Sequence, residues 1–396
     1  MVPGVIRIAV LGSTGSIGEQ ALDVVRSLPD RFRVVALAAG GNAGRLADQL
    51  REFHPAAAFA RDGHEADALR AAVGARLLSG TPAMEWQPLE EIAVRDDVDI
   101  VLVATSGLAG LAPTLAALRA GKKVAIANKE ALVVGGHAVR AALEAGRALG
   151  AELRPVDSEH SAIWQCLWGE TADAVDRLVL TASGGAFRDH LPEALDAVTP
   201  AQALLHPTWK MGAKVTIDSA TLFNKGLEAI EARWLFDVPL DRIDVLMHRE
   251  SVVHSMVTFR DGSVKAQLGE PDMRLPIQVA LTYPERAAAR PAPPLDLLGR
   301  GTLHFEDIDH QRFPALGTAL EAGRRDDTSA AAVAGADDAA VAHFLAGRCR
   351  FTDIARLLER ALDAHEATAA PDLEALLAAE AWGRRFVDDT VKAGVA

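Results

Sequence analysis

The stretch Val5-Ile-Arg-Ile-Ala-Val-Leu11, followed at once by Gly12-Ser-Thr-Gly15-Ser-Ile-Gly18, decides the fold of the first part of the chain. Residues 5–11 form the apolar run of a buried strand, and apolar residues then recur at helical spacing from Ile17 to Val25. In a strand, glycine turn and helix, the glycines let the backbone approach a pyrophosphate, and the helix amides favour the anion. The spacing is a looser variant of G-x-G-x-x-G, so a purely structural turn is the alternative interpretation.

The second predicted strand, at residues 33–39, ends in Gly40-Gly41-Asn42. An NAD site usually places an acidic residue near this point, where it binds the ribose hydroxyls. No acid is present, whereas Arg45 lies close by in the sequence. The sequence therefore favours a site that tolerates the 2′-phosphate of NADP(H).

Two further strands are expected at residues 99–105 and 122–127, with a helix at residues 113–120 between them. This alternation predicts an α/β fold, with an N-terminal Rossmann-like doubly wound sheet. Asn128-Lys129-Glu130 follows the last of these strands, at the edge where open α/β sheets bind ligands. A polar turn before a helix that starts at Ala131 is the alternative.

Acidic residues gather in two later segments, Asp157-Ser158-Glu159-His160 and Asp218-Ser219-Ala-Thr-Leu-Phe-Asn224-Lys225-Gly226-Leu-Glu228. If the strand at residues 151–156 continues, its period of two turns Asp157 and Glu159 to one side. Asn224 and Glu228 are four residues apart and would share a helix face. Three acids beside hydroxyl, amide and ammonium donors suit a divalent cation that holds a phosphorylated substrate, and oxygen ligands favour Mg²⁺ or Mn²⁺ over zinc.

A structural interpretation of these acids stands beside the metal interpretation. Asp157 or Ser158 would cap a helix at residues 161–167, while Glu228 and Glu231 would be solvated acids on a helix surface.

The middle of the chain has a different pattern. Residues 255–260 and 263–268 alternate around Asp261-Gly262, which predicts a β-hairpin within an α+β domain of largely antiparallel strands. Thr181-Ala-Ser183-Gly184-Gly185 offers hydroxyls to a phosphate, although such a turn is more often structural. His206-Pro-Thr-Trp-Lys-Met-Gly212 is interpreted as a mobile lid that excludes water, with a buried loop as the alternative. His248 and His254 are interpreted as structural.

The last part of the chain predicts a C-terminal helical bundle. Residues 287–294 are rich in alanine and proline and are typical of a linker. Amphipathic helices are expected beyond it at residues 315–321, 328–346, 351–365 and 373–386.

Composition limits the class of protein. A chain of 396 residues, 49% hydrophobic and 24% charged, is typical of a globular protein with two or three domains. Its formal net charge of −13 argues against nucleic-acid or anionic-membrane binding, and no apolar run approaches a membrane span. The first strand begins too early to leave room for a signal peptide, and Cys166 and Cys349 are interpreted as thiols in a reducing compartment, so we expect a cytoplasmic protein.

Several long motifs, taken together, closely resemble the 1-deoxy-D-xylulose 5-phosphate reductoisomerase family. They are Gly-Ser-Thr-Gly-Ser-Ile-Gly, Asn-Lys-Glu, Pro-Val-Asp-Ser-Glu-His, Asp-Ser-Ala-Thr-x-x-Asn-Lys-Gly-Leu-Glu, Ile-Glu-Ala-Arg-Trp-Leu-Phe and Leu-Gly-Glu-Pro-Asp-Met-Arg. The resemblance runs over nearly the whole chain. It implies a homodimeric enzyme, dependent on NADPH and on Mn²⁺ or Mg²⁺, that makes 2-C-methyl-D-erythritol 4-phosphate for isoprenoid precursors.

The resemblance also implies roles for single residues. The residues that match NADPH contacts are Thr14, Gly15, Ser16, Ile17, Gly40, Gly41, Asn42, Asn128, Glu130 and Gly212. The metal ligands are Asp157, Glu159 and Glu228. Contacts with the phosphorylated sugar are Ser158, Ser183, His206, Ser219, Asn224 and Lys225, and Lys129 lies beside the reacting carbons. Lys129, Glu159, His206 and Glu228 are the expected catalytic residues, and Trp209 and Met211 belong to the family's flap.

The resemblance implies four segments: an NADPH-binding domain at residues 1–150, a catalytic, metal-binding and dimerisation domain at 151–290, a linker at 291–312 and a helical domain at 313–396. The chain also departs from the family's pattern. Gly41 stands where a lysine or another basic residue often lies, and Thr208 replaces the asparagine of the flap. Ala334-Gly-Ala-Asp337-Asp338 stands in place of an Asn-Ala-Ala-Asn-Glu run.

Two other functions are compatible with parts of the pattern. A simple NADP-dependent dehydrogenase would need the glycine loop but no metal, so a chelator would spare it. An NADPH-binding redox sensor would give no reason for three acids near a lysine-rich phosphate site.

Overall fold

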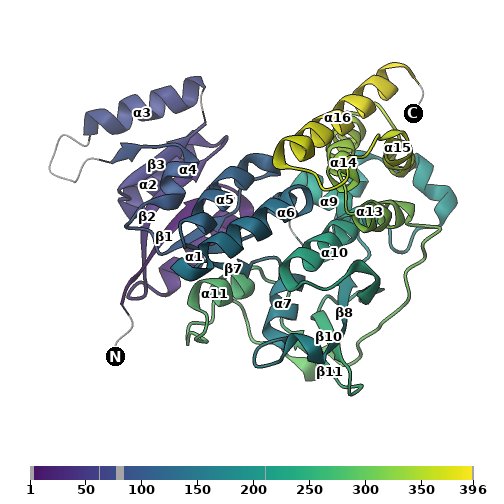
Figure 1. Cartoon of the computed structure of the whole chain (residues 1–396), viewed down its shortest axis with the longest axis horizontal. Helices are drawn as coiled ribbons and strands as arrows, with labels where there is room; N and C mark the ends of the chain where they lie inside the picture. The colour runs from purple at the N-terminus through teal and green to yellow at the C-terminus, as the bar shows by residue number, and fades with distance from the viewer. Residues whose placement is uncertain (1–3, 62, 77–83, 210, 395–396) are drawn as a thin grey trace. The chain divides into compact units, whose positions relative to one another are not determined.

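The computed structural model describes residues 4–61, 63–76, 84–209 and 211–394 (Figure 1). The chain forms two compact units. Unit 1 contains Met1–Ala131, His137–Ser161 and Asp272–Pro293, and unit 2 contains Leu132–Gly136, Ala162–Pro271 and Pro294–Ala396. The domain boundaries predicted at residues 150, 290 and 312 remain predictions.

A parallel sheet forms the centre of unit 1, with the strand order β4-β3-β2-β1-β5-β6-β7 in the described residues. The predicted doubly wound sheet is confirmed. Ile8, Val10, Leu37 and Leu102 are almost completely buried, as expected for apolar strands of a parallel sheet covered on both faces. The strands are β1 (Ile6–Leu11), β2 (Phe32–Ala39), β3 (Ala57–Ala60), β4 (Glu85–Trp86), β5 (Ile100–Val103), β6 (Lys123–Ile126) and β7 (Glu152–Pro155).

The strand order reverses at β1, which lies between β2 and β5. Leu11 at the end of β1 is in register with Val103 at the end of β5. Open α/β sheets bind ligands outside the carboxyl ends of their strands at such a reversal, so this edge of the sheet is the expected nucleotide site.

Helices complete the core of unit 1. Leu22 and Val25 of α1 and Ile277 and Leu281 of α11 are buried in one cluster with the strands. The helices from the first part of the chain are α1 (Ser16–Ser27), α2 (Ala43–Phe53), α3 (His64–Arg76), α4 (Leu89–Val94), α5 (Leu111–Arg119), α6 (Lys129–Gly146) and α7 (Ser158–Cys166), and α11 spans Arg274–Thr282. The 3-10 helices η1 (Gly107–Gly110) and η2 (Arg147–Leu149) lie among them.

Unit 2 contains a mixed sheet with the strand order β11-β10-β8-β9. The predicted hairpin is confirmed, because β10 and β11 pair antiparallel around Gly262, whose φ is +85°. The β10–β8 pair is also antiparallel, whereas β8 and β9 are parallel. The strands are β8 (Val175–Ala182), β9 (Ile243–Met247), β10 (Val253–Phe259) and β11 (Val264–Leu268).

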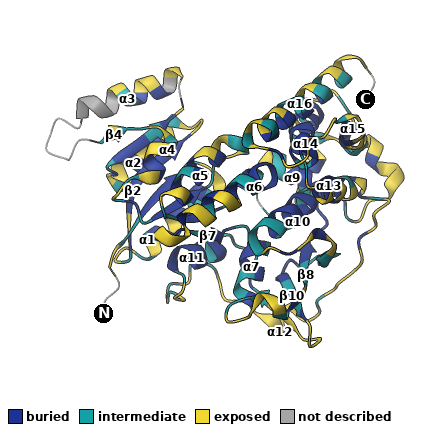
Figure 2. Cartoon of the chain, in the orientation of Figure 1, coloured by how far each residue is buried: buried dark blue, intermediate teal, exposed yellow. Residues whose placement is uncertain are grey.

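The predicted helical bundle is confirmed within unit 2. Most residues of α14 are buried, and it is dark blue in Figure 2. The helices are α8 (Pro200–Ala203), α9 (Ala213–Thr221), α10 (Phe223–Phe236), α12 (Leu297–Arg300), α13 (Pro314–Arg324), α14 (Ser329–Leu345), α15 (Phe351–Ala364) and α16 (Leu373–Lys392). They are accompanied by the 3-10 helices η3 (Ala172–Ala174), η4 (Pro192–Ala197) and η5 (Leu240–Arg242).

The structure describes the state of both cysteines and the lengths of the apolar helices. Cys166 and Cys349 are free thiols, and burial raises the pKa of each to about 11. None of the helices within the described residues is long and apolar enough to cross a membrane.

Candidate active site

The glycine turn after β1 is held tightly against the sheet. Gly12 has φ +91°, and a Cβ atom there would lie 2.4 Å from the carbonyl oxygen of Ala104. A Cβ atom on Gly18 would lie 2.3 Å from the carbonyl oxygen of Gly12. Only glycine fits these two positions, so α1 begins directly beside the ends of β1 and β5.

The start of α1 is suited to an anion. Gly15 precedes the helix, and no side chain among the described residues caps its first amides. Those N–H groups and the helix dipole favour a negatively charged ligand. The predicted contact residues here are all partly or fully exposed: Thr14, Gly15, Ser16 and Ile17.

Gly40, Gly41 and Asn42 are exposed after β2, as the prediction requires. Asn42 caps α2, since its Oδ1 accepts a hydrogen bond from the Arg45 amide at 3.0 Å. The Arg45 side chain turns to α1 instead, where its Nε and Nη2 donate to Glu19 at 2.6 and 2.7 Å. The Arg45 guanidinium group, which the sequence analysis placed near the ribose, therefore forms an ion pair with the Glu19 carboxylate.

Asn128 shapes the turn after β6. Its Nδ2 donates to the carbonyl oxygens of Thr105 and Gly107, both at 2.7 Å, and its Oδ1 accepts from the Ala131 amide at 2.8 Å. Asn128 therefore caps α6, which begins at Lys129 and not at Ala131 as expected. Lys129 and Glu130 are half-buried in the first turn of α6, and Lys129 Nζ lies 3.0 Å from Asp157 Oδ2.

The strand before Asp157 does not continue as supposed. β7 ends at Pro155, and the Asp157 carbonyl accepts from the Ser161 amide at 2.8 Å, so the chain turns directly into α7. The alternation argument for Asp157 and Glu159 is therefore wrong, because the chain is helical by the second carboxylate. Within that turn Ser158 Oγ donates to Glu159 Oε2 at 2.6 Å.

Asn224, Lys225 and Glu228 share one face of α10, as their spacing predicts. Asn224 Nδ2 donates to Glu228 Oε1, and Lys225 Nζ lies 2.5 Å from Glu228 Oε2. Glu228 is 1% exposed and Lys225 is 5% exposed. A buried carboxylate with two donors is held in one orientation, and the prediction of a solvated Glu228 is excluded.

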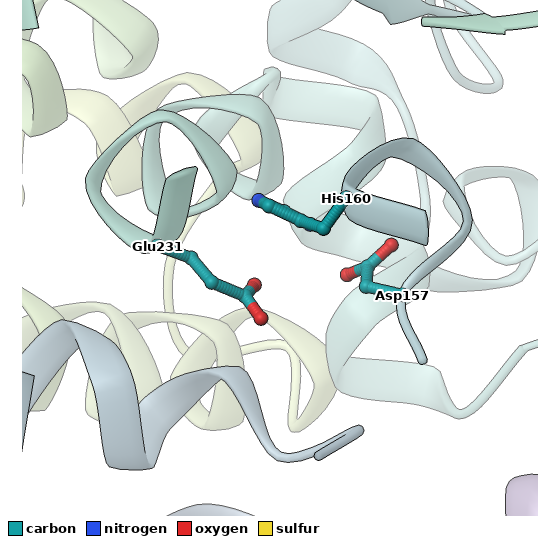
Figure 3. Close-up of side chains that lie close together, drawn as sticks. All are labelled: Asp157, His160 and Glu231. Atoms are coloured by element: carbon teal, nitrogen blue, oxygen red, sulfur yellow. The ribbon is translucent and has the colours of Figure 1, made fainter. Parts of the chain in front are cut away.

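The three predicted metal ligands come together. Asp157, Glu159 and Glu228 each offer a carboxylate oxygen, and these oxygens lie within 4.8 Å of one another. Asp157 also belongs to a second group of the same kind with His160 and Glu231, and Figure 3 shows the carboxylates of Asp157 and Glu231 turned toward each other beside the His160 ring.

His160 and Glu231 were missed as candidate ligands. Both are completely buried, so the interpretation of Glu231 as a solvated acid is wrong. The available signal was their spacing: His160 follows Glu159 directly, and Glu231 lies three residues after Glu228 on the same helix.

Ser183 and His206 form a hydrogen-bonded pair. The Thr208 and Trp209 amides donate to His206 Nδ1 at 3.1 and 2.8 Å, so the ring proton lies on Nε2 and is donated to Ser183 Oγ at 3.0 Å. Burial, aided by the charge of Arg188, lowers the pKa of His206 to about 4. The imidazole is therefore neutral near pH 7.

The remaining predicted residues lie around α9. Gly212 is exposed and precedes this helix, and Ser219 is half-buried in its last turn. Met211 is half-buried, whereas Lys210 lies outside the described residues. The lid prediction for residues 206–212 remains a prediction.

The two histidines interpreted as structural are both buried. His248 Nδ1 donates to the His304 carbonyl at 2.8 Å, and its Nε2 accepts from the Val252 and Val253 amides. The structural interpretation is confirmed for His248.

A parallel sheet with a glycine turn at its strand reversal, together with a cluster of buried and half-buried carboxylates, defines an NAD(P)-type α/β oxidoreductase with an acid-rich site. Family profiles match most of the chain. The 1-deoxy-D-xylulose 5-phosphate reductoisomerase profile covers residues 8–136, and two profiles of its C-terminal domains cover residues 153–236 and 268–386.

Individual proteins agree with the profiles. The chain is 51% identical over 381 residues to a 1-deoxy-D-xylulose 5-phosphate reductoisomerase of Shouchella clausii (strain KSM-K16), covering 96% of this chain and 98% of that protein. A reductoisomerase of Synechococcus sp. (strain JA-2-3B'a(2-13)) is 50% identical, covering 96% of this chain and 95% of its own length. The chain belongs to the 1-deoxy-D-xylulose 5-phosphate reductoisomerase family.

Solved structures of the family have the same fold. The Zymomonas mobilis reductoisomerase in complex with NADPH is 39% identical with a TM-score of 0.88, covering 98% of this chain and all of that one. A reductoisomerase in complex with NADPH, fosmidomycin and magnesium is 37% identical with a TM-score of 0.89, covering 98% of each chain.

Proposed function

We propose that this chain converts 1-deoxy-D-xylulose 5-phosphate into 2-C-methyl-D-erythritol 4-phosphate where Asp157, Glu159 and Glu228 come together. The observation that carries the proposal is the convergence of three carboxylate oxygens within 4.8 Å, from segments far apart in the sequence. The family assignment supplies the reaction, and the described residues supply the groups that it needs.

The donor set fits a divalent cation. Asp157, Glu159, Glu228 and Glu231 bring four carboxyl groups, and Lys129 and Lys225 bring two ammonium groups, so the acids outnumber the bases by two. Hard carboxylate oxygens suit Mg²⁺ or Mn²⁺. When bound, such an ion acts as a Lewis acid on substrate oxygens, and NADPH supplies the hydride.

The chain's own residues would hold the phosphorylated sugar. Lys225 and Asn224 place an ammonium and an amide on the face of α10 that carries Glu228, while Ser183 and neutral His206 place a hydroxyl and a ring N–H at the end of β8. We assign the substrate phosphate to Ser183, His206, Ser219, Asn224 and Lys225. Binding energy at a phosphate remote from the reacting carbons fixes the orientation of the substrate.

Lys129 and Ser158 complete the proposed substrate site. Lys129 lies 3.0 Å from a carboxylate oxygen of Asp157 with only 13% of its side chain exposed, so its ammonium is held beside the acid cluster. There it would stabilise negative charge that develops on substrate oxygens. Ser158 follows Asp157 in the sequence, and its hydroxyl group orients Glu159 by a hydrogen bond.

We assign the NADPH site to the edge of the unit 1 sheet. The first turn of α1 would receive the pyrophosphate at Thr14, Gly15, Ser16 and Ile17, and Gly40, Gly41 and Asn42 would receive the ribose end. Asn128 would act by fixing the turn after β6, since its side chain is engaged with backbone groups. Glu130 and Gly212 are the further contacts proposed.

Replacement of Glu228 tests this assignment. Glu228→Gln removes one ligand charge, so we expect turnover to fall roughly 100-fold or more, with the loss greatest at limiting Mn²⁺. NADPH affinity, measured separately by fluorescence titration, should stay nearly unchanged.

Glu359→Gln is the matched control, because Glu359 is an exposed acid on α15. Product identification with and without EDTA separates the reductoisomerase from a metal-free dehydrogenase. Turnover of Glu228→Gln at the level of the control would remove Glu228 from the ligand set.

We propose a homodimer in the cytoplasm. β11 is the last strand of its sheet, and Val264 is 55% exposed on it, so this edge is open to a second copy of the chain. The free thiols Cys166 and Cys349 are consistent with a reducing compartment.

A further inference from the structure

Two arginines lie near the end of β2, and their surroundings differ. Arg45 is clamped by Glu19, and Gln49 fixes that carboxylate by donating to Glu19 Oε1 at 2.7 Å. Gln49 is itself buried and bound to Ser13, whose Oγ donates to Gln49 Oε1 at 2.7 Å. The Arg45 charge is therefore neutralised by Glu19, whose carboxylate is held in place by Gln49.

Arg61 reaches the same strand end from β3. It directly follows Ala60, and its amide donates to the carbonyl oxygen of Ala39, the last residue of β2, at 3.1 Å. A Cβ atom on Gly40 would lie 3.2 Å from Arg61 Nη2 and 3.5 Å from its Cζ. The guanidinium group is thus packed beside the Gly40 backbone, at the turn where the adenosine ribose is expected.

The charge of Arg61 is available for a ligand. The residue is exposed, and within the described residues no carboxylate pairs with its guanidinium group. The adjacent Gly41 has no side chain, and a Cβ atom there would meet nothing within 4 Å. The position that is often basic in the family is therefore an open space in this chain, next to an arginine from another strand.

We infer that Arg61 is the residue that recognises the 2′-phosphate of NADPH in this chain, in place of a basic residue at position 41. A planar guanidinium group binds phosphate through paired charge-assisted hydrogen bonds, which NADH cannot form. No acidic residue at positions 40–42 repels the phosphate. The inference rests on the proposed function, in which NADPH is the cofactor, and names the residue that distinguishes NADPH from NADH.

The test measures binding directly. Kd values for NADPH and NADH by fluorescence titration, and for 2′,5′-ADP and 5′-AMP by calorimetry, are compared between wild type and Arg61→Gln. We expect Arg61→Gln to weaken NADPH and 2′,5′-ADP by roughly 10- to 100-fold, the scale of a lost hydrogen bond to a charged group. NADH and 5′-AMP should change by less than about threefold.

Two further variants sharpen the result. Removal of the Glu19–Arg45 pair as a unit, with Glu19→Gln and Arg45→Gln together, leaves the net charge unchanged and should leave the NADPH-to-NADH ratio within about threefold of wild type. Adding Gly41→Lys to Arg61→Gln places an ammonium in the open space and should restore most of the preference for NADPH.

An unchanged NADPH-to-NADH ratio in Arg61→Gln would overturn the inference. So would an equal loss of both nucleotides, or a wild-type chain that binds NADH as tightly as NADPH. Normal nucleotide binding without conversion of the sugar phosphate would instead count against the proposed function alone.

Discussion

Lys214, at the start of α9, holds carboxylates that belong to two helices. Its Nζ lies 2.6 Å from Asp218 Oδ2, 2.7 Å from Asp337 Oδ2 and 3.4 Å from Asp338 Oδ1. Asp337 is completely buried. Burial raises the pKa of Asp337 well above its ordinary range, the Asp218 charge raises it further, and Lys214 opposes both. Arg384 forms ion pairs with Asp338 and Glu380.

The raised pKa of Asp337 predicts a pH dependence of stability. A carboxyl group whose pKa is higher in the folded state contributes stability at low pH, and this contribution is lost as pH rises from about 4, its unfolded value, through the folded pKa. Asp337→Asn cannot ionise. We expect Tm measured from pH 4 to pH 9 to fall less steeply with rising pH in Asp337→Asn than in wild type.

Asp363→Asn, at an exposed position of α15, is the control for Asp337→Asn. If wild type and Asp337→Asn lose Tm in parallel as pH rises, Asp337 does not hold the proton.

The chain's departure from an Asn-Ala-Ala-Asn-Glu run in this part of the sequence thus acquires a physical description: it adds a buried acid beside Lys214.

At the scale of elements, α14 and α16 cross with their backbones almost in contact. A Cβ atom on Gly335 would lie 2.0 Å from the Glu380 carbonyl oxygen, and one on Gly383 would lie 1.9 Å from that of Ala332. Backbone atoms cannot rotate away as a side chain can. The two glycines therefore set the distance between these helices.

Gly335→Val should force the two helices apart. We expect a loss of about 1–3 kcal/mol in the free energy of unfolding, as for overpacking in cores, measured by urea titration. Gly317→Ala is the control, because a Cβ atom at Gly317 on α13 would meet nothing within 4 Å. There, alanine should be neutral or stabilising by up to about 1 kcal/mol. A Gly335→Val chain as stable as wild type would show that the helices separate freely.

The elements that the sequence predicted are those with a strong local pattern. The turn at Gly12 and the hairpin at Gly262 were predicted because their glycine patterns are typical of few other structures. β3 and β4 were missed because Ala57–Ala60 and Glu85–Trp86 are too short to show a period. Of the two interpretations of Asp157, the structure agrees with the start of a helix and not with a continued strand, because β7 ends at Pro155 and α7 begins at Ser158.

The candidate site could be predicted only in part for a related reason. The spacing of Asn224 and Glu228 fixes their shared helix face, since it depends on α10 alone. The burial of Glu231 and His160 depends on packing between distant segments, which spacing along the chain does not encode. The ion pair of Arg45 with Glu19 likewise required the packing of α2 against α1.

At the scale of the whole molecule, the exposed edge of β11 predicts the oligomeric state. We expect light scattering after size-exclusion chromatography to give about twice the chain mass of 41.9 kDa. Val264→Lys adds a charge to that edge and should shift the mass toward the monomer. Leu149→Lys, at another exposed apolar position, should not. A wild-type mass equal to that of one chain would refute the dimer.

The segment Asp272–Pro293 has a consequence for how the protein is made. It belongs to unit 1 but follows more than a hundred residues of unit 2 in the sequence. Its helix α11 contributes Ile277 and Leu281 to the apolar core that also contains β1. A ribosome must therefore synthesise about seven tenths of the polypeptide before unit 1 can complete its apolar core. Until then the nascent chain carries an unfinished apolar surface, which is the stage at which chaperone binding would matter most.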